Sequence, residues 1–321
     1  MRALQWDGHT LRLEPDHAPP ELRPGWVRLR TRLAGICSTD LQIFQGYMGF
    51  TGVPGHEAVL EVLEVAGDPD HPQVGERVVA EINFACGACT ACARGLERHC
   101  PHRTVLGILG ADGVFADEVA APLVNLHRVP AAVPDEAAVF AEPLAAAFEI
   151  LEQVPHVGGV EALVLGDGKL GLLCAQVLAA SGARVTVIGK HEGKLRLAGE
   201  LGLTPLAVDA FHPDGAHDLV VEATGSARGL ETAMAAVRPR GTLVLKTTVA
   251  AQHSVSLAPL VINEVTVVGS RCGPFAPALT ALAEGRVHVA PLISAEYPLD
   301  EGLAAVERAK VPGTLKVLLR P

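Results

Sequence analysis

Four of the seven cysteines of this chain fall within fifteen residues, and this cluster is its clearest chemical signal. They are Cys86, Cys89, Cys92 and Cys100, spaced C-x2-C-x2-C-x7-C. Four thiolates this close in sequence can complete a tetrahedral shell around one Zn²⁺. Gly87, Gly95 and the small alanines let the loop wrap tightly around an ion. Because four protein ligands leave no open position, we expect a structural zinc site and not a catalytic one.

Two alternatives remain for the cluster. Four cysteines also bind iron–sulfur clusters, or they can be reduced surface thiols without a metal. Zinc is favoured because four exposed, unligated thiols would be open to oxidation. The odd cysteine count disfavours a disulfide framework, as does the N-terminus MRALQWDG, which has no apolar core of a signal peptide. We therefore expect a cytoplasmic chain.

A second group of possible metal ligands lies outside the cluster. Cys37 follows A-G-I, His56 and Glu57 follow V-P-G, and Glu142 precedes a proline. One thiolate, one imidazole and one carboxylate make a reasonable open zinc site with a position left for water or substrate. Each signal is weak alone, because a single cysteine is often a small core side chain and Glu142 can be a charge at a helix N-terminus.

A glycine-rich turn predicts dinucleotide binding. The apolar run ALVLG (162–166) leads into G-D-G-K-L-G (166–171) and then a helical segment, which is G-x-G-x-x-G between a strand and a helix. Gly166 would make the tight turn, Gly168 would let the backbone approach a pyrophosphate, and Gly171 would allow close helix–strand packing. Lys169 and Leu170 complete the pyrophosphate turn, where the helix N-terminus supplies positive partial charge. The alternative is a glycine-rich turn without a ligand.

The end of the next strand predicts which dinucleotide binds. An acidic residue there would hydrogen-bond the ribose 2′-hydroxyl of NAD. This chain has Gly189 at that position, followed by Lys190, His191 and Lys194. A small residue followed by cations suits the 2′-phosphate of NADP, so we expect NADP, with NAD possible. Alternatively, the lysines are ordinary surface charges and Glu192 reaches the ribose.

Later strand ends should also face the cofactor. In a doubly wound sheet, ligands bind outside the carboxyl ends of the strands. Thr224 and Gly225 end one strand, and Lys246, Thr247 and Thr248 end the next. We expect the first pair near the cofactor and the other three on its nicotinamide side.

The elements around these residues indicate an α/β chain. Short β-type runs alternate with glycine and proline over the first 140 or so residues, as in 26–36, 58–67 and 76–82, which favours a β-barrel. A helix is expected over 135–154. Strands at 162–166, 184–189, 218–225, 241–248 and 265–270 then alternate with helices at 170–182, 194–202 and 229–237, which indicates a parallel doubly wound sheet. A helix at 278–285 and a strand at 314–320 could return to the first domain.

Composition excludes several classes of function. The chain has 321 residues, 49% hydrophobic and 19% charged, which suits two domains with large cores. Its net charge of −10 argues against nucleic-acid binding, which needs a basic surface. No uncharged apolar stretch reaches the ~18 residues that span a bilayer, so we expect no membrane partner.

Together, these motifs identify a family. The chain resembles the zinc-dependent medium-chain dehydrogenase/reductase family, the alcohol dehydrogenase superfamily. The matching landmarks occur in the family's order over nearly the whole chain: G-I-C-S-T-D (35–40), G-H-E (55–57), the cysteine cluster, E-P (142–143), G-D-G-K-L-G, V-E-A-T-G (221–225) and G-S-R-C-G (269–273). The G-H-E and E-P pair resembles the polyol, glucose and threonine dehydrogenase branch.

The resemblance implies a GroES-like catalytic β-barrel from residues 1–145 and 272–321, with the zinc lobe at 86–100, and a Rossmann domain from 146–271. It implies that Cys37 and His56 bind a catalytic zinc, with Glu57 or Glu142 as the carboxylate ligand. Thr39 matches the hydroxyl that relays the substrate proton. Relatives often carry histidine at the outer relay position, where this chain has Gln42.

The expected function is hydride transfer between a secondary alcohol or polyol, or the matching carbonyl, and a nicotinamide cofactor. The small-molecule substrate is not specified by the sequence, and the resemblance implies a homodimer or homotetramer. Two alternatives are a zinc-free double-bond reductase on the same fold and a non-catalytic NADP-binding sensor. The reductase would need neither the Cys37, His56 and Glu57 set nor the cysteine lobe.

Overall fold

The structure is a computed structural model that describes residues 1–65, 72–248 and 254–321. The chain divides into two compact units. The first unit comprises Met1–Glu142 and Leu292–Pro321, and the second comprises Pro143–Pro291. Both chain ends therefore belong to the first unit, as the sequence predicts.

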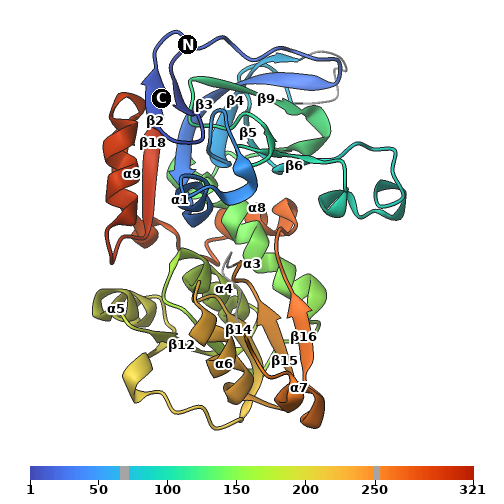
Figure 1. The fold of residues 1–321 in the computed structure, drawn as a ribbon, viewed down its shortest axis with the longest axis vertical. Helices are drawn as coiled ribbons and strands as arrows, with labels where there is room; N and C mark the ends of the chain where they lie inside the picture. The colour runs from blue at the N-terminus through green and yellow to red at the C-terminus, as the bar shows by residue number, and fades with distance from the viewer. Residues whose placement is uncertain (66–71, 249–253) are drawn as a thin grey trace. The chain divides into compact units, whose positions relative to one another are not determined.

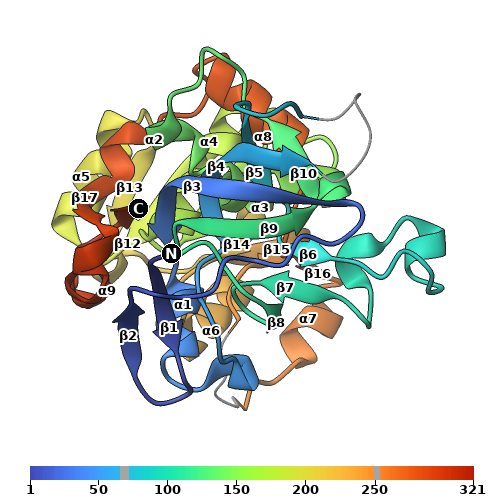
Figure 2. The same cartoon turned by 90° about the horizontal axis from the view of Figure 1, so that it is seen from above.

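The first unit is built on a seven-stranded sheet. Its strands are β3 (Trp26–Ile36), β4 (Glu57–Val65), β5 (Arg77–Ala80), β9 (Glu118–Pro122), β10 (Leu126–Arg128), β17 (Ile293–Pro298) and β18 (Lys316–Arg320). The order is β10-β5-β4-β3-β18-β17, and β9 pairs with the first half of β3. Figure 2 shows β9, β3, β4, β5 and β10 lying side by side. The β-rich architecture that the sequence predicts for this part of the chain is confirmed.

Strand β3 is the longest member of this sheet and contacts three others. Val27, Leu29 and Leu33 are fully buried along it. Its first half pairs with β9 and β4, and its end pairs with β4 on one side and β18 on the other. The C-terminal strand thus completes a sheet that the N-terminal segment begins.

Smaller elements complete the first unit. A hairpin is formed by β1 (Ala3–Trp6) and β2 (Leu11–Glu14), and a three-stranded sheet by β6 (Asn83–Phe84), β7 (Thr104–Leu106) and β8 (Gly110–Ala111). The α-helices are α1 (Ser38–Ile43), α2 (Asp135–Ala138) and α9 (Gly302–Lys310). Helix α3 (Ala141–Gln153) contains the boundary with the second unit.

The second unit contains a six-stranded parallel sheet in the order β13-β12-β11-β14-β15-β16. Its strands are β11 (Glu161–Leu165), β12 (Arg184–Gly189), β13 (Thr204–Ala207), β14 (His217–Glu222), β15 (Val237–Leu245) and β16 (Thr266–Gly269). The helices are α4 (Lys169–Ala180), α5 (Glu192–Glu200), α6 (Ala227–Ala236), α7 (Ala258–Ile262) and α8 (Phe275–Ala283). Figure 1 shows this strand–helix alternation, which confirms the predicted Rossmann fold.

The second unit extends further along the chain than the sequence suggests. The prediction places the return to the catalytic domain at residue 272, whereas the unit ends at Pro291. Gln176 of α4 explains part of this difference. Its amide donates to the His288 carbonyl at 3.2 Å, and its oxygen accepts the His288 N–H at 2.8 Å. These bonds hold residues after α8 to the parallel sheet's first helix.

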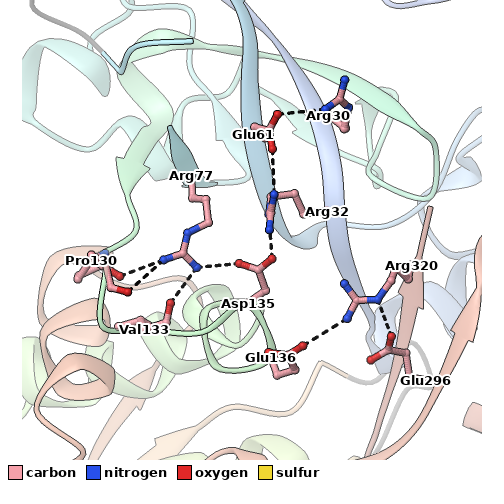
Figure 3. A network of polar contacts seen from close by, with 11 residues as sticks. Arg30, Arg32, Glu61, Arg77, Pro130, Val133, Asp135, Glu136, Glu296 and Arg320 are labelled. Atoms are coloured by element: carbon pink, nitrogen blue, oxygen red, sulfur yellow. Dashed lines mark hydrogen bonds and ion pairs between the residues drawn. The ribbon is translucent and has the colours of Figure 1, made fainter. Parts of the chain in front are cut away.

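The helix expected over 135–154 is two helices, α2 and α3. Helix α2 is fixed by Asp135, whose carboxylate accepts hydrogen bonds from Arg32 of β3 at 2.8 Å and Arg77 of β5 at 2.7 Å. Figure 3 shows this network, which also includes Glu61 of β4. It ties the segment that leads into α3 to three strands of the sheet.

The neighbouring arginines Arg32 and Arg77 keep the buried Asp135 carboxylate ionised. Burial acts to raise the pKa of this carboxyl, but the hydrogen bonds from Arg77 and Arg32 outweigh burial, so the pKa lies below its usual value.

No helix within the described ranges is both long enough and apolar enough to cross a membrane.

Replacing Asp135 with asparagine should lower the free energy of unfolding by about 1–3 kcal/mol near neutral pH, because two arginines lose a charged acceptor. A carboxyl with a lowered folded pKa stabilises above its unfolded pKa, and this contribution is lost as the pH falls through the folded value. Urea unfolding from neutral to acidic pH should therefore show the difference between D135N and wild type shrinking in acid. The exposed pair of Glu161 and Arg184 supplies the control, since E161Q should change little. A D135N deficit that is independent of pH would contradict this account.

Candidate active site and metal centres

Cys37 stands where β3 gives way to α1. It is the N-cap of that helix, and its Sγ accepts the N–H of Thr39 at 3.5 Å. Asp40, three residues on, accepts the N–H of Cys37 at 2.7 Å, which completes a capping box. The first turn of α1 therefore fixes Cys37, Thr39 and Asp40 relative to one another.

His56 is positioned by a crowded turn before β4. Gly55 has φ of +96°, and a Cβ at this position would overlap the ring of Phe115. The Cα atoms of Gly107 and Gly113 lie directly against the backbone of Gly55, where larger residues would clash. Only glycine fits this turn, so the direction in which His56 leaves it is fixed.

Glu57 is the first residue of β4 and pairs with Gly35 of β3. A Cβ on Gly35 would lie 2.8 Å from Glu57 Oε2, so glycine makes room for the carboxylate. Lys316 of β18 is fully buried and donates its ammonium to that same oxygen. Its Nζ also lies 5.3 Å from the centre of the Phe140 ring. Sequence reasoning missed Lys316, whose signal is a single lysine at the start of the apolar strand K-V-L-L.

The ligand atoms of Cys37, His56 and Glu57 all lie within 4.8 Å of one another. His56 Nδ1 lies 3.2 Å from Asp40 Oδ1, which leaves Nε2 for a metal. A carboxylate on the second ring nitrogen is a common support for metal-binding histidine. Burial acts to lower the pKa of His56, but Asp40 and Cys37 raise it well above its usual value. The same negative charges attract a divalent cation, so the residues present fit zinc.

Asp40 is the second residue that sequence reasoning missed, although it ends the G-I-C-S-T-D motif. Thr39 Oγ1 lies 3.7 Å from Cys37 Sγ, so the predicted proton relay begins beside the predicted ligand. Glu142 lies in the first turn of α3 and is not a member of the three-residue ligand group. Gln42 is half-buried in α1.

The four predicted lobe cysteines also come together. The sulfurs of Cys86, Cys89, Cys92 and Cys100 all lie within 4.8 Å of one another. Gly87 and Gly95 have φ of +70° and +71°, so these glycines make the left-handed turns of the lobe. The lobe follows β6, contains the 3₁₀ helices η2 (Cys92–Arg94) and η3 (Glu97–His99), and extends away from the strands of its unit in Figure 1.

The lobe places several thiols with shifted pKa values close together, which suits binding of a cation. Hydrogen bonds from the backbone N–H groups of Cys92 and Cys86 lower the pKa values of Cys89 and Cys100, respectively. Burial and the neighbouring sulfurs raise the pKa of Cys92 to about 11. A divalent cation would favour the thiolate form of all four cysteines, and tetrahedral sulfur coordination suits Zn²⁺.

In the second unit, the glycine-rich turn has the geometry that dinucleotide binding requires. A Cβ on Gly166 would lie 2.5 Å from the Ala223 carbonyl, and one on Gly171 would overlap the Gly166 carbonyl. Gly168 is the N-cap of α4, and a Cβ there would meet nothing within 4 Å. Lys169 and Leu170 form the first turn of α4 and are half-buried.

The other predicted cofactor residues, apart from Lys194, lie at the ends of neighbouring strands. Gly189 ends β12 in register with Ala207 of β13, and Lys190 and His191 follow it directly. Lys194 lies in α5. Thr224 and Gly225 follow β14, where Gly225 N–H donates to Thr247 Oγ1 at 3.0 Å. Thr248 is exposed just after Thr247.

Lys246 is engaged inside the second unit. Its Nζ donates to the carbonyls of Ala146 at 2.7 Å and Arg271 at 3.1 Å, and to Ser270 Oγ at 3.1 Å. These bonds give Lys246 a structural role at the end of β15, in addition to the cofactor role that the sequence predicts.

The two ligand sets and the two folds define a class of protein, the zinc-binding dehydrogenases. Residues 23–131 match the family model of the alcohol dehydrogenase GroES-like domain, and residues 170–284 match that of the zinc-binding dehydrogenases. A sorbitol dehydrogenase of Halalkalibacterium halodurans is 31% identical over 94% of both chains. The chain belongs to the zinc-dependent medium-chain dehydrogenase/reductase family and is an enzyme of its alcohol and polyol dehydrogenase branch.

Two further relatives agree with this assignment. A D-altritol 5-dehydrogenase of Agrobacterium fabrum is 31% identical, covering 92% of this chain and 93% of the relative. The solved structure of an alcohol dehydrogenase from Thermus sp. ATN1 is 30% identical, with a TM-score of 0.91 and coverage of 100% of this chain and 99% of the other. The predicted family and fold class are confirmed.

Substituting Gly55 with alanine should destabilise the first unit, because the new methyl overlaps Phe115 and the backbone is left-handed. Gly46 is the matched control, since it has φ of +93° and a Cβ added there would meet nothing within 4 Å. Thermal and urea unfolding should show a cost of about 1 kcal/mol for G46A and a clearly larger one for G55A. Equal losses in the two variants would mean that the crowding around Gly55 does not position the turn.

Proposed function

We propose that this enzyme oxidises a secondary alcohol or polyol, or reduces the matching carbonyl, with a nicotinamide dinucleotide as hydride acceptor or donor. The grouping of Cys37, His56 and Glu57, supported by Asp40, is the observation that carries the proposal. The names of the sorbitol and D-altritol relatives support a polyol as substrate. A zinc-free double-bond reductase would have no use for this ligand group.

Cys37 and His56 are the proposed ligands of the catalytic zinc, with Glu57 or Glu142 as the carboxylate. A bound zinc supplies Lewis acidity, which lowers the pKa of an alcohol or polarises a carbonyl. Asp40 orients His56, and its hydrogen bond to the Cys37 N–H fixes the start of α1. Lys316 donates a hydrogen bond to one oxygen of Glu57, and the same carboxylate also lies in the group with Cys37 and His56. The lobe cysteines Cys86, Cys89, Cys92 and Cys100 are the proposed ligands of a second, structural zinc.

Thr39 is the proposed acceptor of the substrate hydroxyl proton. Its hydroxyl lies beside Cys37 Sγ at the start of α1. Gln42, one turn further along the same helix, cannot titrate. An outer histidine is therefore missing at this position, and water or the ribose of a bound cofactor would have to take the proton from Thr39.

The second unit is the proposed dinucleotide site. Gly166, Gly168, Lys169, Leu170 and Gly171 would hold the pyrophosphate at the N-terminus of α4. The remaining contacts would come from the strand ends and from Lys194 of α5. The strand-end residues are Gly189, Lys190, His191, Thr224, Gly225, Lys246, Thr247 and Thr248. NADP is the preferred form because Lys190 and Lys194 suit its 2′-phosphate, and NAD is the second form.

The proposed assembly is a homodimer or homotetramer. Strand β16 ends the sheet order of the second unit. Helix α7 before it exposes Val261 and Ile262, and its N-cap residue Leu257 is also exposed. Unpaired sheet edges next to apolar surface favour association. Light scattering should give two or four times the mass of one chain, and a single-chain mass would overturn this part of the proposal. A cytoplasmic location is proposed because none of the seven cysteines, all of which lie in the described residues, forms a disulfide.

Turnover of T39V tests the proposed proton path. A panel of polyols and secondary alcohols, each with NADP and NAD, identifies the working substrate from the absorbance of reduced nicotinamide. Turnover should fall by about 10²–10⁴-fold in T39V because a proton acceptor is lost. T39S keeps the hydroxyl and should retain most of the turnover. Equal turnover in wild type and T39V would exclude Thr39 from the relay, and no turnover by wild type with any alcohol would refute the proposed reaction.

A further inference from the structure

Asp167 is a buried carboxylate that sequence reasoning does not assign to any role. It lies in the glycine-rich turn after β11, is 6% exposed, and reaches across to the end of the neighbouring strand β12. Its Oδ2 accepts the backbone N–H groups of Lys190 at 2.9 Å and His191 at 2.8 Å. The same oxygen lies 2.9 Å from His191 Nδ1.

Gly189 is glycine because Asp167 occupies the space beside it. A Cβ on Gly189 would lie 2.5 Å from Asp167 Cβ and 2.6 Å from Oδ2. The end of this strand is the position from which an acidic residue reads the ribose 2′-hydroxyl in NAD-binding folds. The carboxylate that β12 lacks is thus supplied from the adjacent turn.

The carboxylate is charged at neutral pH and is surrounded by donors. Burial acts to raise the pKa of Asp167, but its hydrogen bonds to His191 and Lys190 outweigh burial and lower it. Lys194 of α5 also interacts with its charge. The groups that would attract a phosphate here are therefore already partly engaged by an anion.

We propose that Asp167 is a specificity-determining residue that weakens binding of the 2′-phosphate of NADP. It repels that phosphate and holds the N–H groups and imidazole at the end of β12 that would otherwise donate to it. Lys190 and Lys194 favour the phosphate, while Asp167 offsets part of this attraction, so the enzyme accepts NAD as well. This inference rests on the proposed dinucleotide site.

D167N tests the charge with little change in shape. An asparagine oxygen at the position of Oδ2 can still accept both backbone N–H groups, so the turn should be preserved. The probes are 2′,5′-ADP and 5′-AMP, which differ only in the 2′-phosphate, and calorimetric titration of the intact protein gives both Kd values. The ratio of the two Kd values isolates the effect on the 2′-phosphate.

In D167N, 2′,5′-ADP should bind about tenfold more tightly relative to 5′-AMP than it does in wild type. E200Q is the matched control, because it removes the same charge from the far end of α5 and should leave the ratio unchanged. E192Q tests the rival carboxylate at the start of that helix. Thermal unfolding of each variant shows that the fold is retained, and D167S serves as a second neutral variant if D167N is unstable.

An unchanged ratio in the folded neutral variant would overturn the proposal, and so would an equal change in E200Q or a change confined to E192Q. If wild type binds neither probe, the dinucleotide site itself fails, and the proposal fails with it. Binding of both probes with no response to D167N would refute only the role of Asp167.

Discussion

The pairing of the end of β3 with its two neighbours is the constraint on which the candidate metal site depends. Gly35 lies opposite Glu57 of β4 on one side and Leu318 of β18 on the other. This register brings Lys316 to Glu57 and places Cys37 one residue beyond the strand. A buried charge without a partner is costly, so the ion pair also commits the C-terminal strand to this position in the sheet. Residues from both ends of the chain thereby fix one ligand group.

Local turn geometry and side-chain hydrogen bonds together determine the direction of the proposed ligands Cys37 and His56. The capping box of α1 orients Cys37 and Asp40, and the crowded turn at Gly55 orients His56. Asp40 then connects the two proposed ligands, because it faces the His56 ring and accepts the Cys37 N–H. Such support from outside the ligand group is what holds a metal site to a useful geometry.

Much of the fold and of the candidate ligand groups was predictable, because they depend on patterns of residues close together in the sequence. Strands β3 and β12 have the expected bounds, since apolar periodicity and flanking glycines are local features. The cysteine lobe was predictable from spacing alone. Lys316 and Asp167 were not, because their roles depend on contacts with residues 259 and 24 positions away, respectively. From Gly189 we expected room for the 2′-phosphate at the end of β12, whereas in the structure the carboxylate of Asp167 lies beside this glycine.

Zinc content by elemental analysis shows whether Cys37, His56 and Glu57 hold a metal ion in addition to the cysteine lobe. Wild-type protein, C37S and C174S would each be incubated with zinc and freed of excess ion before measurement. Cys174 is a buried cysteine of α4 outside both ligand groups, so C174S controls for the loss of one thiol. We expect two zinc ions per chain in wild type and C174S, and one in C37S. One ion in all three proteins would contradict this expectation, because the Cys37, His56 and Glu57 group would then hold no metal.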